Sequence, residues 1–369
     1  MSRVDRARDL LREAELDAAL VSHPANRFWL TGFPAEDHGP DESSGVVVID
    51  HSGVTLLVSG TNLPWAAAAA RPAIDVERWT HPWPAFVAGR LREAGARRVG
   101  FEEHALTVGD WSAMRAQAVD RIELLPLHGG LDRLREVKDD EELALLERAI
   151  AITDAVFLAI RAELRPGMTE RAVADRIEAL MRERGAQGPS FPTIVAAGPH
   201  AARPHHEPSE RPLAPGEPII IDMGARLDGY CADLTRTVCL GPPAAPFAAI
   251  YDIVLTAQAA ALGAIRAGMT GREADATARD AVAAAGHGDR FIHGLGHGLG
   301  VKVHEAPSLG RASDDVLRPG QVVTVEPGIY LEDWGGVRIE DVGVVTDDGL
   351  RDLTHAPKAA DAMLIEIRT

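Results

Sequence analysis

The sequence contains only two cysteines, Cys231 and Cys239, in 369 residues. A disulfide framework and a cysteine-rich zinc site are therefore excluded, and we expect both residues to be small buried side chains. The chain also lacks an uncharged apolar run of about 18 residues, the length that spans a bilayer, and its charged N-terminal segment differs from a secretory signal. We expect a protein of the reducing cytoplasm with no membrane partner.

Positive charge is also scarce, because 38 lysines and arginines face 55 aspartates and glutamates, for a net charge of −17. Such a surface repels the phosphates of nucleic acids, so we expect no nucleic-acid partner and favour an enzyme that acts on small molecules. The length of 369 residues exceeds the roughly 250–300 that usually share one hydrophobic core, which indicates two domains.

Short apolar runs in the first third of the chain alternate with helical stretches, which is typical of an α/β domain with a mainly buried sheet. The expected strands cover residues 18–21, 45–49, 54–58 and 99–101, and the expected helices cover 63–70, 84–93 and 108–118. Gly129-Gly130 interrupts this pattern, and a charged helix begins near Lys138. We place the junction within residues 128–137, with an N-terminal α/β domain over 1–130 and an α+β domain over 131–369.

The second domain contains an internal sequence repeat, since residues 165–185 resemble residues 266–286 and each segment contains a Gly-Met-Thr helix start. Thr270 and Glu273 fit a capping box, and Thr169 is a similar cap without the box. The repeat predicts two αβ halves related by a pseudo-twofold axis, with functional residues from both halves meeting between them. Two unrelated helices with similar caps are the alternative.

Two aspartates mark a predicted hairpin, in which an apolar strand ends at Asp222, a turn lies at Asp228-Gly229 and a returning strand carries Asp233. The turn lies midway between the two aspartates, so their carboxylates are expected to face each other and to raise each other's pKa unless a cation lies between them. A hairpin with two solvated aspartates is the other interpretation.

Histidines and glutamates follow in similarly apolar surroundings. His293, His297 and His304 lie in a glycine-rich segment that does not match a dinucleotide-binding fingerprint. Glu326 ends an apolar strand, and Glu340 is predicted to lie inside another, where a buried carboxylate without a partner is costly.

Arg338 shares a strand face with Glu340, so it either orients a ligand carboxylate or forms a structural ion pair with that glutamate. Four carboxylates and one imidazole suit a pair of divalent ions such as Mn²⁺, Co²⁺ or Zn²⁺. The predicted metal ligands are Asp222, Asp233, His297, Glu326 and Glu340.

The sequence segments that contain these residues resemble those of the pita-bread metallopeptidases, in particular the branch of prolidase (Xaa-Pro dipeptidase) and aminopeptidase P. The resemblance extends over the whole chain and includes NRFWLTGF, REVKDDEELALL and RPGMTE besides the ligand segments. It implies a creatinase/prolidase-type N-terminal domain, a C-terminal pita-bread catalytic domain and a homodimer. It also implies two divalent ions per subunit, with Mn²⁺ favoured, and a short proline-containing peptide whose Xaa-Pro bond is hydrolysed by a metal-bridging hydroxide.

The resemblance also assigns roles to the metal ligands. Asp222 and Asp233 bind one ion, while Asp233, His297 and Glu326 surround the pair and Glu340 bridges it. Glu326 is in addition the proton shuttle.

Histidines complete the implied substrate pocket. His304 stabilises the oxyanion, and His205 or His293 holds the residue on the leaving side. His206 leaves a one-residue ambiguity, and spacing favours His205. Arg311 is a candidate for binding a substrate carboxylate.

The segment of residues 34–45 departs from the family pattern because it is longer and more acidic. We hypothesise that Glu36, Asp37, Asp41 or Glu42 caps a substrate pocket across a homodimer, with a solvated acidic loop as the alternative. Three other functions share the fold: an amidinohydrolase, a hydrolase of a solute such as ectoine, and a binding module without catalysis.

Overall fold

A computed structural model describes residues 2–39, 41–80, 82–118 and 122–367. The chain divides into two compact units, Met1–Arg135 and Glu136–Thr369. This division lies within the segment 128–137 that the sequence marks as the junction.

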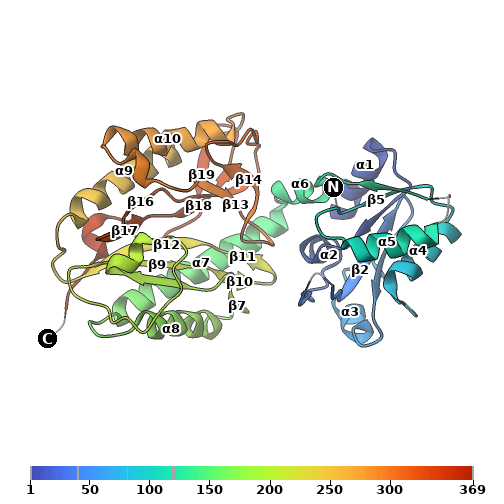
Figure 1. The fold of residues 1–369 in the computed structure, drawn as a ribbon, viewed down its shortest axis with the longest axis horizontal. Coiled ribbons are helices and arrows are strands. Elements are labelled where there is room, and N and C mark those ends of the chain that lie inside the picture. The colour runs from blue at the N-terminus through green and yellow to red at the C-terminus, as the bar shows by residue number, and fades with distance from the viewer. Residues whose placement is uncertain (1, 40, 81, 119–121, 368–369) are drawn as a thin grey trace. The chain divides into compact units, whose positions relative to one another are not determined.

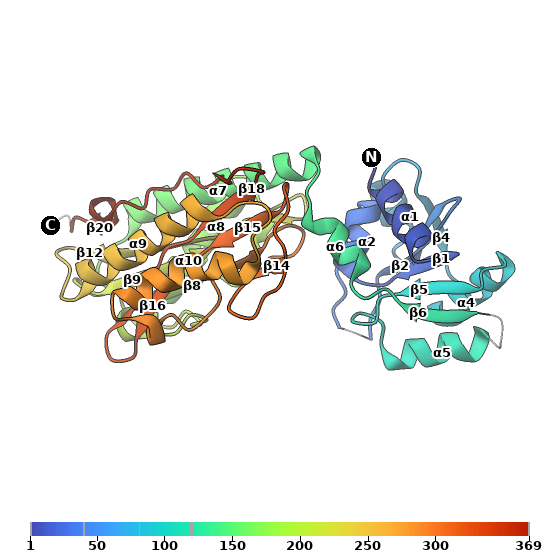
Figure 2. The ribbon, with the colours of Figure 1, turned by 90° about the horizontal axis from the view of Figure 1, so that it is seen from above.

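The first unit is built on a six-stranded mixed sheet with the order β4-β3-β2-β1-β5-β6. Its strands are β1 (Ala18–Val21), β2 (Gly45–Asp50), β3 (Val54–Val58), β4 (Asp75–Arg78), β5 (Arg98–Phe101) and β6 (Glu123–Pro126). Its helices are α1 (Arg3–Glu13), α2 (Pro24–Thr31), α3 (Leu63–Ala69), α4 (Trp83–Glu93) and α5 (Val108–Ala118), and α6 (Gly130–Glu136) leads into the second unit. Figure 2 shows α1 on one side of this sheet and α5 on the other.

Burial on both faces explains why the central strand β1 is apolar throughout. Ala18 and Leu20 of β1 pack with Leu91 of α4 and Met114 of α5, while the alternate residues of β1 are also buried. The expected α/β domain is therefore present, with β4 and β6 as additional edge strands.

The acidic segment of this unit is partly structural. Arg27 is fully buried and donates to both carboxylate oxygens of Asp37, at 3.0 and 3.2 Å. The Ser44 N–H also donates to Asp37, at 2.8 Å. Asp37 therefore stabilises its own domain, whereas Asp41 and Glu42 are exposed.

The second unit contains two helix pairs and two larger sheets, which have the orders β20-β12-β9-β8 and β14-β13-β15-β18-β19. The helices are α7 (Asp140–Glu163), α8 (Glu170–Glu183), α9 (Phe247–Ala264) and α10 (Gly271–Ala284), with 3-10 turns η1 (Gly198–Ala202), η2 (Gly288–Arg290) and η3 (Ala360–Met363). The strands are β7 (Gly188–Pro189), β8 (Ile194–Ala197), β9 (Pro218–Met223), β10 (Ala225–Leu227), β11 (Tyr230–Cys231), β12 (Leu234–Leu240), β13 (Gly296–Gly298), β14 (Glu305–Leu309), β15 (Val322–Val325), β16 (Gly328–Leu331), β17 (Gly335–Arg338), β18 (Asp341–Val345), β19 (Leu350–Asp352) and β20 (Leu364–Ile365). Figure 1 shows α9 and α10 on one side of the sheets and α8 on the other.

The two halves of this unit repeat each other's backbone contacts. Thr169 caps α8, and Thr270 caps α10 in a capping box with Glu273, as the sequence predicts. The segment before α8 pairs with a later strand-like segment, and the segment before α10 does the same, through the bridges Thr169↔Pro212 and Thr270↔Val316. The internal sequence repeat therefore corresponds to a structural repeat, and the two halves have the pseudo-twofold arrangement that it predicts.

Helix α9 is the one described helix long and apolar enough to cross a membrane by length and composition alone. Core helices have the same composition, and α9 packs its buried residues Phe247, Ile250, Tyr251 and Val254 into the main hydrophobic cluster of this unit. Cys231 and Cys239 are both buried thiols, which confirms the prediction for the cysteines.

Candidate metal centre and active site

Two nested hairpins place the first pair of carboxylates. Strands β9 and β12 form the outer hairpin, in which Asp222 pairs with Thr235. The inner pair, β10 and β11, is joined by Asp228 and Gly229, whose positive φ values of 47° and 84° make a tight two-residue turn. Asp233 was predicted on the returning strand but lies just before β12.

Close packing across this hairpin depends on a glycine. A Cβ atom at Gly224 would lie 1.8 Å from the carbonyl oxygen of Ala232, so only glycine permits the approach. The two strands can then bring Asp222 and Asp233 to the same cavity.

The second half of the unit supplies the other three predicted ligands. His297 is the central residue of β13, and Glu326 directly follows β15, where its N–H donates to the carbonyl of Leu295 at 2.8 Å. Glu340 was predicted inside a strand, but it lies in the link between β17 and β18. The chain leaves β17 at this point, and the Glu340 N–H donates instead to the carbonyl of Thr235 at 3.1 Å.

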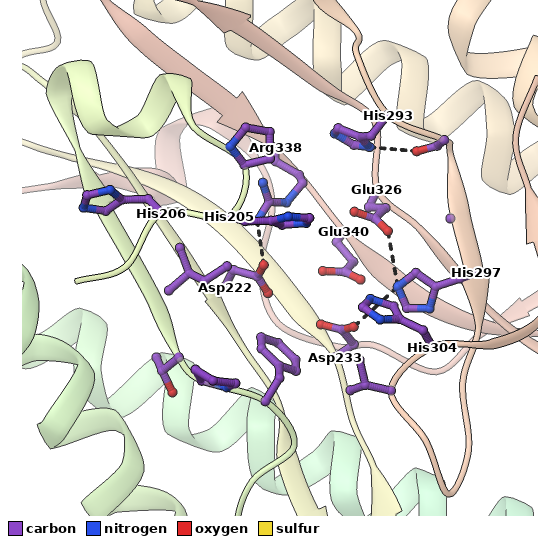
Figure 3. Close-up of a pocket in the computed structure, with 18 of the residues that line it drawn as sticks. His205, His206, Asp222, Asp233, His293, His297, His304, Glu326, Arg338 and Glu340 are labelled. Carbon is purple, nitrogen blue, oxygen red and sulfur yellow. Dashed lines mark hydrogen bonds and ion pairs between the residues drawn. The ribbon is translucent and has the colours of Figure 1, made fainter. Parts of the chain in front are cut away.

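All five predicted ligands line one cavity of about 550 Å³. One ligand atom each from Asp233, His297 and Glu340 lie within 4.8 Å of one another. The Nε2 atom of His297 is also 3.4 Å from Glu326 Oε1 and 3.8 Å from Asp233 Oδ2. Figure 3 shows these side chains converging from strands of both halves.

The ionised form of these carboxyl groups is unfavourable in this cavity when no cation is present. Burial raises the pKa of Glu326 to about 8. Burial, together with the neighbouring carboxylates, also raises the pKa values of Asp233 and Glu340 well above their ordinary range. Without a cation, protons would have to neutralise this cluster.

The hydrogen bonds of His297 indicate where a cation belongs. Its Nδ1 lies 3.0 Å from the carbonyl oxygen of Gly298, so Nδ1 carries the proton and donates. Burial lowers the pKa of His297 to about 4, which keeps the ring neutral. The unprotonated Nε2 therefore faces the oxygens of Asp233 and Glu326, an arrangement that a metal ion satisfies.

Asp222 provides a second indication. Its Oδ2 accepts from Arg338 at 2.6 Å, but its buried Oδ1 has no hydrogen-bond partner among the residues that the structure describes. A buried carboxylate oxygen without a partner is costly unless a cation binds it. The donor set and its geometry therefore fit divalent metal.

Arg338 contacts Asp222 and not Glu340, the partner that strand spacing suggested for an ion pair. Its guanidinium also donates to Thr235 Oγ1 at 3.1 Å and to the hydroxyl of Tyr330 at 2.9 Å. Arg338 is 3% exposed, so its charge is held at a fixed position beside the Asp222 carboxylate.

Tyr330 extends this network to His293 and was not identified from the sequence. His293 Nδ1 lies 2.7 Å from the carbonyl of Gly294 and donates to it, so its Nε2 accepts from the Tyr330 hydroxyl at 2.8 Å. Burial, reinforced by the charge of Arg338, lowers the pKa of His293 to about 4. Both ring nitrogens of His293 are thus engaged.

The other three histidines predicted at the site, His205, His206 and His304, divide into two groups. His205 and His304 are exposed side chains on the cavity wall, and the His304 ring lies 4.4 Å from that of His297, edge to face. His206 is buried and directs its Nε2 to Glu170 at 2.9 Å. Figure 3 shows His205 among the cavity side chains and His206 directed away from them.

Apolar side chains complete the cavity wall and could receive an apolar part of a substrate; these are Phe191, Pro192, Ile194 and Val303. Arg311 does not line this cavity but an adjoining, more open one, which shares His293, Gly294 and Ser308 with it.

A cavity with four buried or half-buried carboxylates and a neutral imidazole, carried by two αβ halves, is typical of a metallohydrolase. Comparison with known proteins identifies the family. Residues 144–347 match the model of metallopeptidase family M24, and residues 3–137 match the creatinase/prolidase N-terminal domain. The chain belongs to metallopeptidase family M24, whose members depend on a dinuclear metal centre.

Relatives extend this similarity over nearly the full length. A Lactobacillus delbrueckii subsp. lactis protein named Xaa-Pro dipeptidase is 36% identical over 361 residues, which cover 96% of this chain and 97% of that protein. The structure of an Xaa-Pro dipeptidase from Bacillus anthracis is 38% identical, with a TM-score of 0.91 and 99% of each chain covered. An X-Pro aminopeptidase from Thermotoga maritima is 30% identical, with a TM-score of 0.88 and 99% and 100% covered.

Proposed function

We propose that this protein is a metal-dependent peptidase that hydrolyses the Xaa-Pro bond at the N-terminus of short peptides. The observation that carries this proposal is the cavity in which all five predicted ligands converge. Relatives named for Xaa-Pro substrates support the bond specificity, and the family model supports the peptidase class.

Two manganese ions per subunit are the proposed cofactor. Carboxylate-rich ligand sets with a single imidazole favour hard divalent ions, although Co²⁺ and Zn²⁺ also accept them. Asp222 and Asp233 would bind one ion, and His297 and Glu326 would complete the pair with Glu340 between them. When bound, such ions supply a nucleophile from water at neutral pH and neutralise negative charge that develops at the scissile carbonyl.

Glu326 is the proposed proton carrier of the reaction. Its carboxylate lies in the cavity beside the other proposed ligands, and Thr324 Oγ1 lies 3.4 Å from its Oε1. It would take the proton of the attacking water and pass it to the leaving nitrogen, which is general acid–base catalysis by one group.

His304 and His205 are the proposed substrate contacts. Both are exposed at the cavity wall, where His304 could donate to the developing oxyanion and His205 could hold the residue on the leaving side. His293 was the alternative for the leaving side, but it is engaged by Tyr330 and Gly294, so we assign it to positioning. Arg338 orients the ligand Asp222.

A homodimer in the cytoplasm is the proposed setting. The acidic loop hypothesis is kept for Glu36, Asp41 and Glu42, but Asp37 is removed from it because Arg27 binds its carboxylate within the same domain. We expect replacement of these three residues by alanine to change the ratio of dipeptide to tripeptide hydrolysis, and an unchanged ratio would contradict the hypothesis.

The test is to remove metal, restore Mn²⁺ and compare hydrolysis of an Xaa-Pro dipeptide with that of an Xaa-Pro-Xaa tripeptide. Glu326→Ala is expected to abolish turnover, and Glu332→Ala, at an exposed glutamate outside the cavity, is the matched control. Dipeptide cleavage alone identifies a dipeptidase, and tripeptide cleavage an aminopeptidase. Turnover without metal, or none on either substrate, would contradict the proposal and favour an amidinohydrolase, a solute hydrolase or a binding module.

A further inference from the structure

A second cluster of potential metal ligands lies outside the carboxylate-rich cavity centre. Glu170 is the first residue of α8, His200 lies in η1, and His206 follows the turn that carries His205. One ligand atom from each of Glu170, His200 and His206 lies within 4.8 Å of the others. None of these three belongs to the ligand set proposed for the dinuclear centre.

The distances within this cluster suit coordination of a single ion. His200 Nδ1 lies 2.9 and 3.2 Å from the two oxygens of Glu170, and His206 Nε2 lies 2.9 Å from Oε2. Zinc binds nitrogen and oxygen at about 2.0–2.2 Å, so its neighbouring ligand atoms are about 3.4 Å apart in a tetrahedron. The observed contacts are about 0.5 Å shorter, so an ion enters among the three side chains when the imidazoles rotate outward by that amount.

Hydrogen bonds from neighbouring groups hold the Glu170 carboxylate in place, as they do for carboxylates that bind metal ions. It accepts from the Ala197 N–H at 2.9 Å and from the N–H and hydroxyl of Ser209 at 3.0 and 2.6 Å. Burial opposes ionisation, but these hydrogen bonds and those of the two imidazoles hold the pKa of Glu170 below its ordinary value. Such outer contacts orient a ligand and keep it charged.

We propose that Glu170, His200 and His206 form a third metal site that binds one Zn²⁺ ion. Two imidazoles and one carboxylate suit zinc, whereas the carboxylate-rich centre suits manganese, so the two sites differ in their preferred metal. The side chain of His200 is 25% exposed, which gives the ion a route in and leaves a coordination position for water. A bound ion would tie the segment that carries His205 to α8.

The first experiment isolates the new site in the full-length protein. The double variant Asp233→Asn, Glu340→Gln disables the dinuclear centre, and zinc per subunit is measured by elemental analysis after dialysis against micromolar free Zn²⁺. We expect one ion per subunit in the double variant and none after His200→Gln is added. His355→Gln, at an exposed histidine outside both clusters, is the matched control and keeps the ion.

Glutamine retains an N–H that can donate to Glu170, so His200→Gln removes a zinc ligand while preserving the hydrogen bond. Zinc X-ray absorption of the double variant provides a measurement that needs no histidine replacement, and we expect two imidazole nitrogens at about 2.0–2.1 Å. An absence of bound zinc, zinc retained after His200→Gln, or a shell without imidazole would overturn the proposal. Because peptidase activity is not measured, failure of the proposed function would leave this result intact.

Discussion

Removal of divalent metal is expected to make the cavity take up protons. Burial raises the pKa of Glu326 to about 8, so at pH 7 about 0.9 of this group is protonated in the metal-free protein. Asp233 and Glu340 have raised pKa values as well and add to this number. Since ligands must lose their protons to coordinate, Mn²⁺ binding at pH 7 is expected to release about one proton or more per subunit.

The assay is calorimetric titration of the metal-free protein with Mn²⁺ in two buffers of different ionisation enthalpy. The difference in apparent binding enthalpy gives the number of protons released, and the apparent affinity is expected to rise about tenfold per pH unit and per proton until about pH 8. Asp41→Asn, which removes an exposed carboxylate in the first unit, is the control and leaves the proton count unchanged. Equal enthalpies in both buffers, with an affinity independent of pH between 6 and 8, would refute the reasoning.

The same groups set how the stability of the metal-free protein depends on pH. A carboxyl group whose pKa is raised on folding stabilises the folded state below its ordinary pKa, and this contribution is lost as pH rises through the folded value. For Glu326 the window runs from the ordinary value of 4.5 to about 8 and corresponds to up to about 5 kcal/mol. We expect urea titrations to show the metal-free protein weakening over this range and Mn²⁺ restoring it; stability that rises with pH would contradict this.

Three substitutions test the framework of the cavity. Gly224→Ala places a Cβ 1.8 Å from a facing carbonyl oxygen, so we expect metal binding to be lost and the unfolding free energy to fall by more than about 2 kcal/mol, whereas Gly263→Ala meets no atom within 4 Å and is expected to raise it by about 0.5–1 kcal/mol. Arg338→Met leaves the Asp222 carboxylate buried without its cation, and we expect a loss of about 3–5 kcal/mol in denaturant titrations of the metal-free protein. Tyr330→Phe is expected to lower kcat about tenfold at unchanged metal content, because it removes a hydroxyl that orders the cavity wall. Three results would contradict the proposed roles of these residues: full metal binding by Gly224→Ala, unchanged stability of metal-free Arg338→Met, or a normal kcat for Tyr330→Phe.

Local chemistry made several features predictable from the sequence. The Thr270–Glu273 capping box and the Asp228-Gly229 turn depend only on neighbouring residues, and the structure contains both. The grouping of the ligands followed because each stands in an apolar segment where an unpartnered charge is unfavourable.

Features that depend on distant partners were not predictable in the same way. Apolar patterning does not show where strand pairing stops, so Glu340 was placed inside a strand when it lies between two. The sequence around Tyr330 gives no sign that its hydroxyl joins Arg338 to His293. Glu170 fits the first turn of a helix, and its histidine partners follow 30 and 36 residues later.

The repeated halves of the second unit also bear on how such a centre could arise. Asp222 follows the apolar run of β9 as Glu326 follows that of β15, and Asp233 precedes β12 as Glu340 precedes β18. In a pair of identical halves, each half would give the same two carboxylates to a centre on the symmetry axis. Here the first half offers two aspartates and the second the longer glutamates, so the two sides of the centre are not chemically alike.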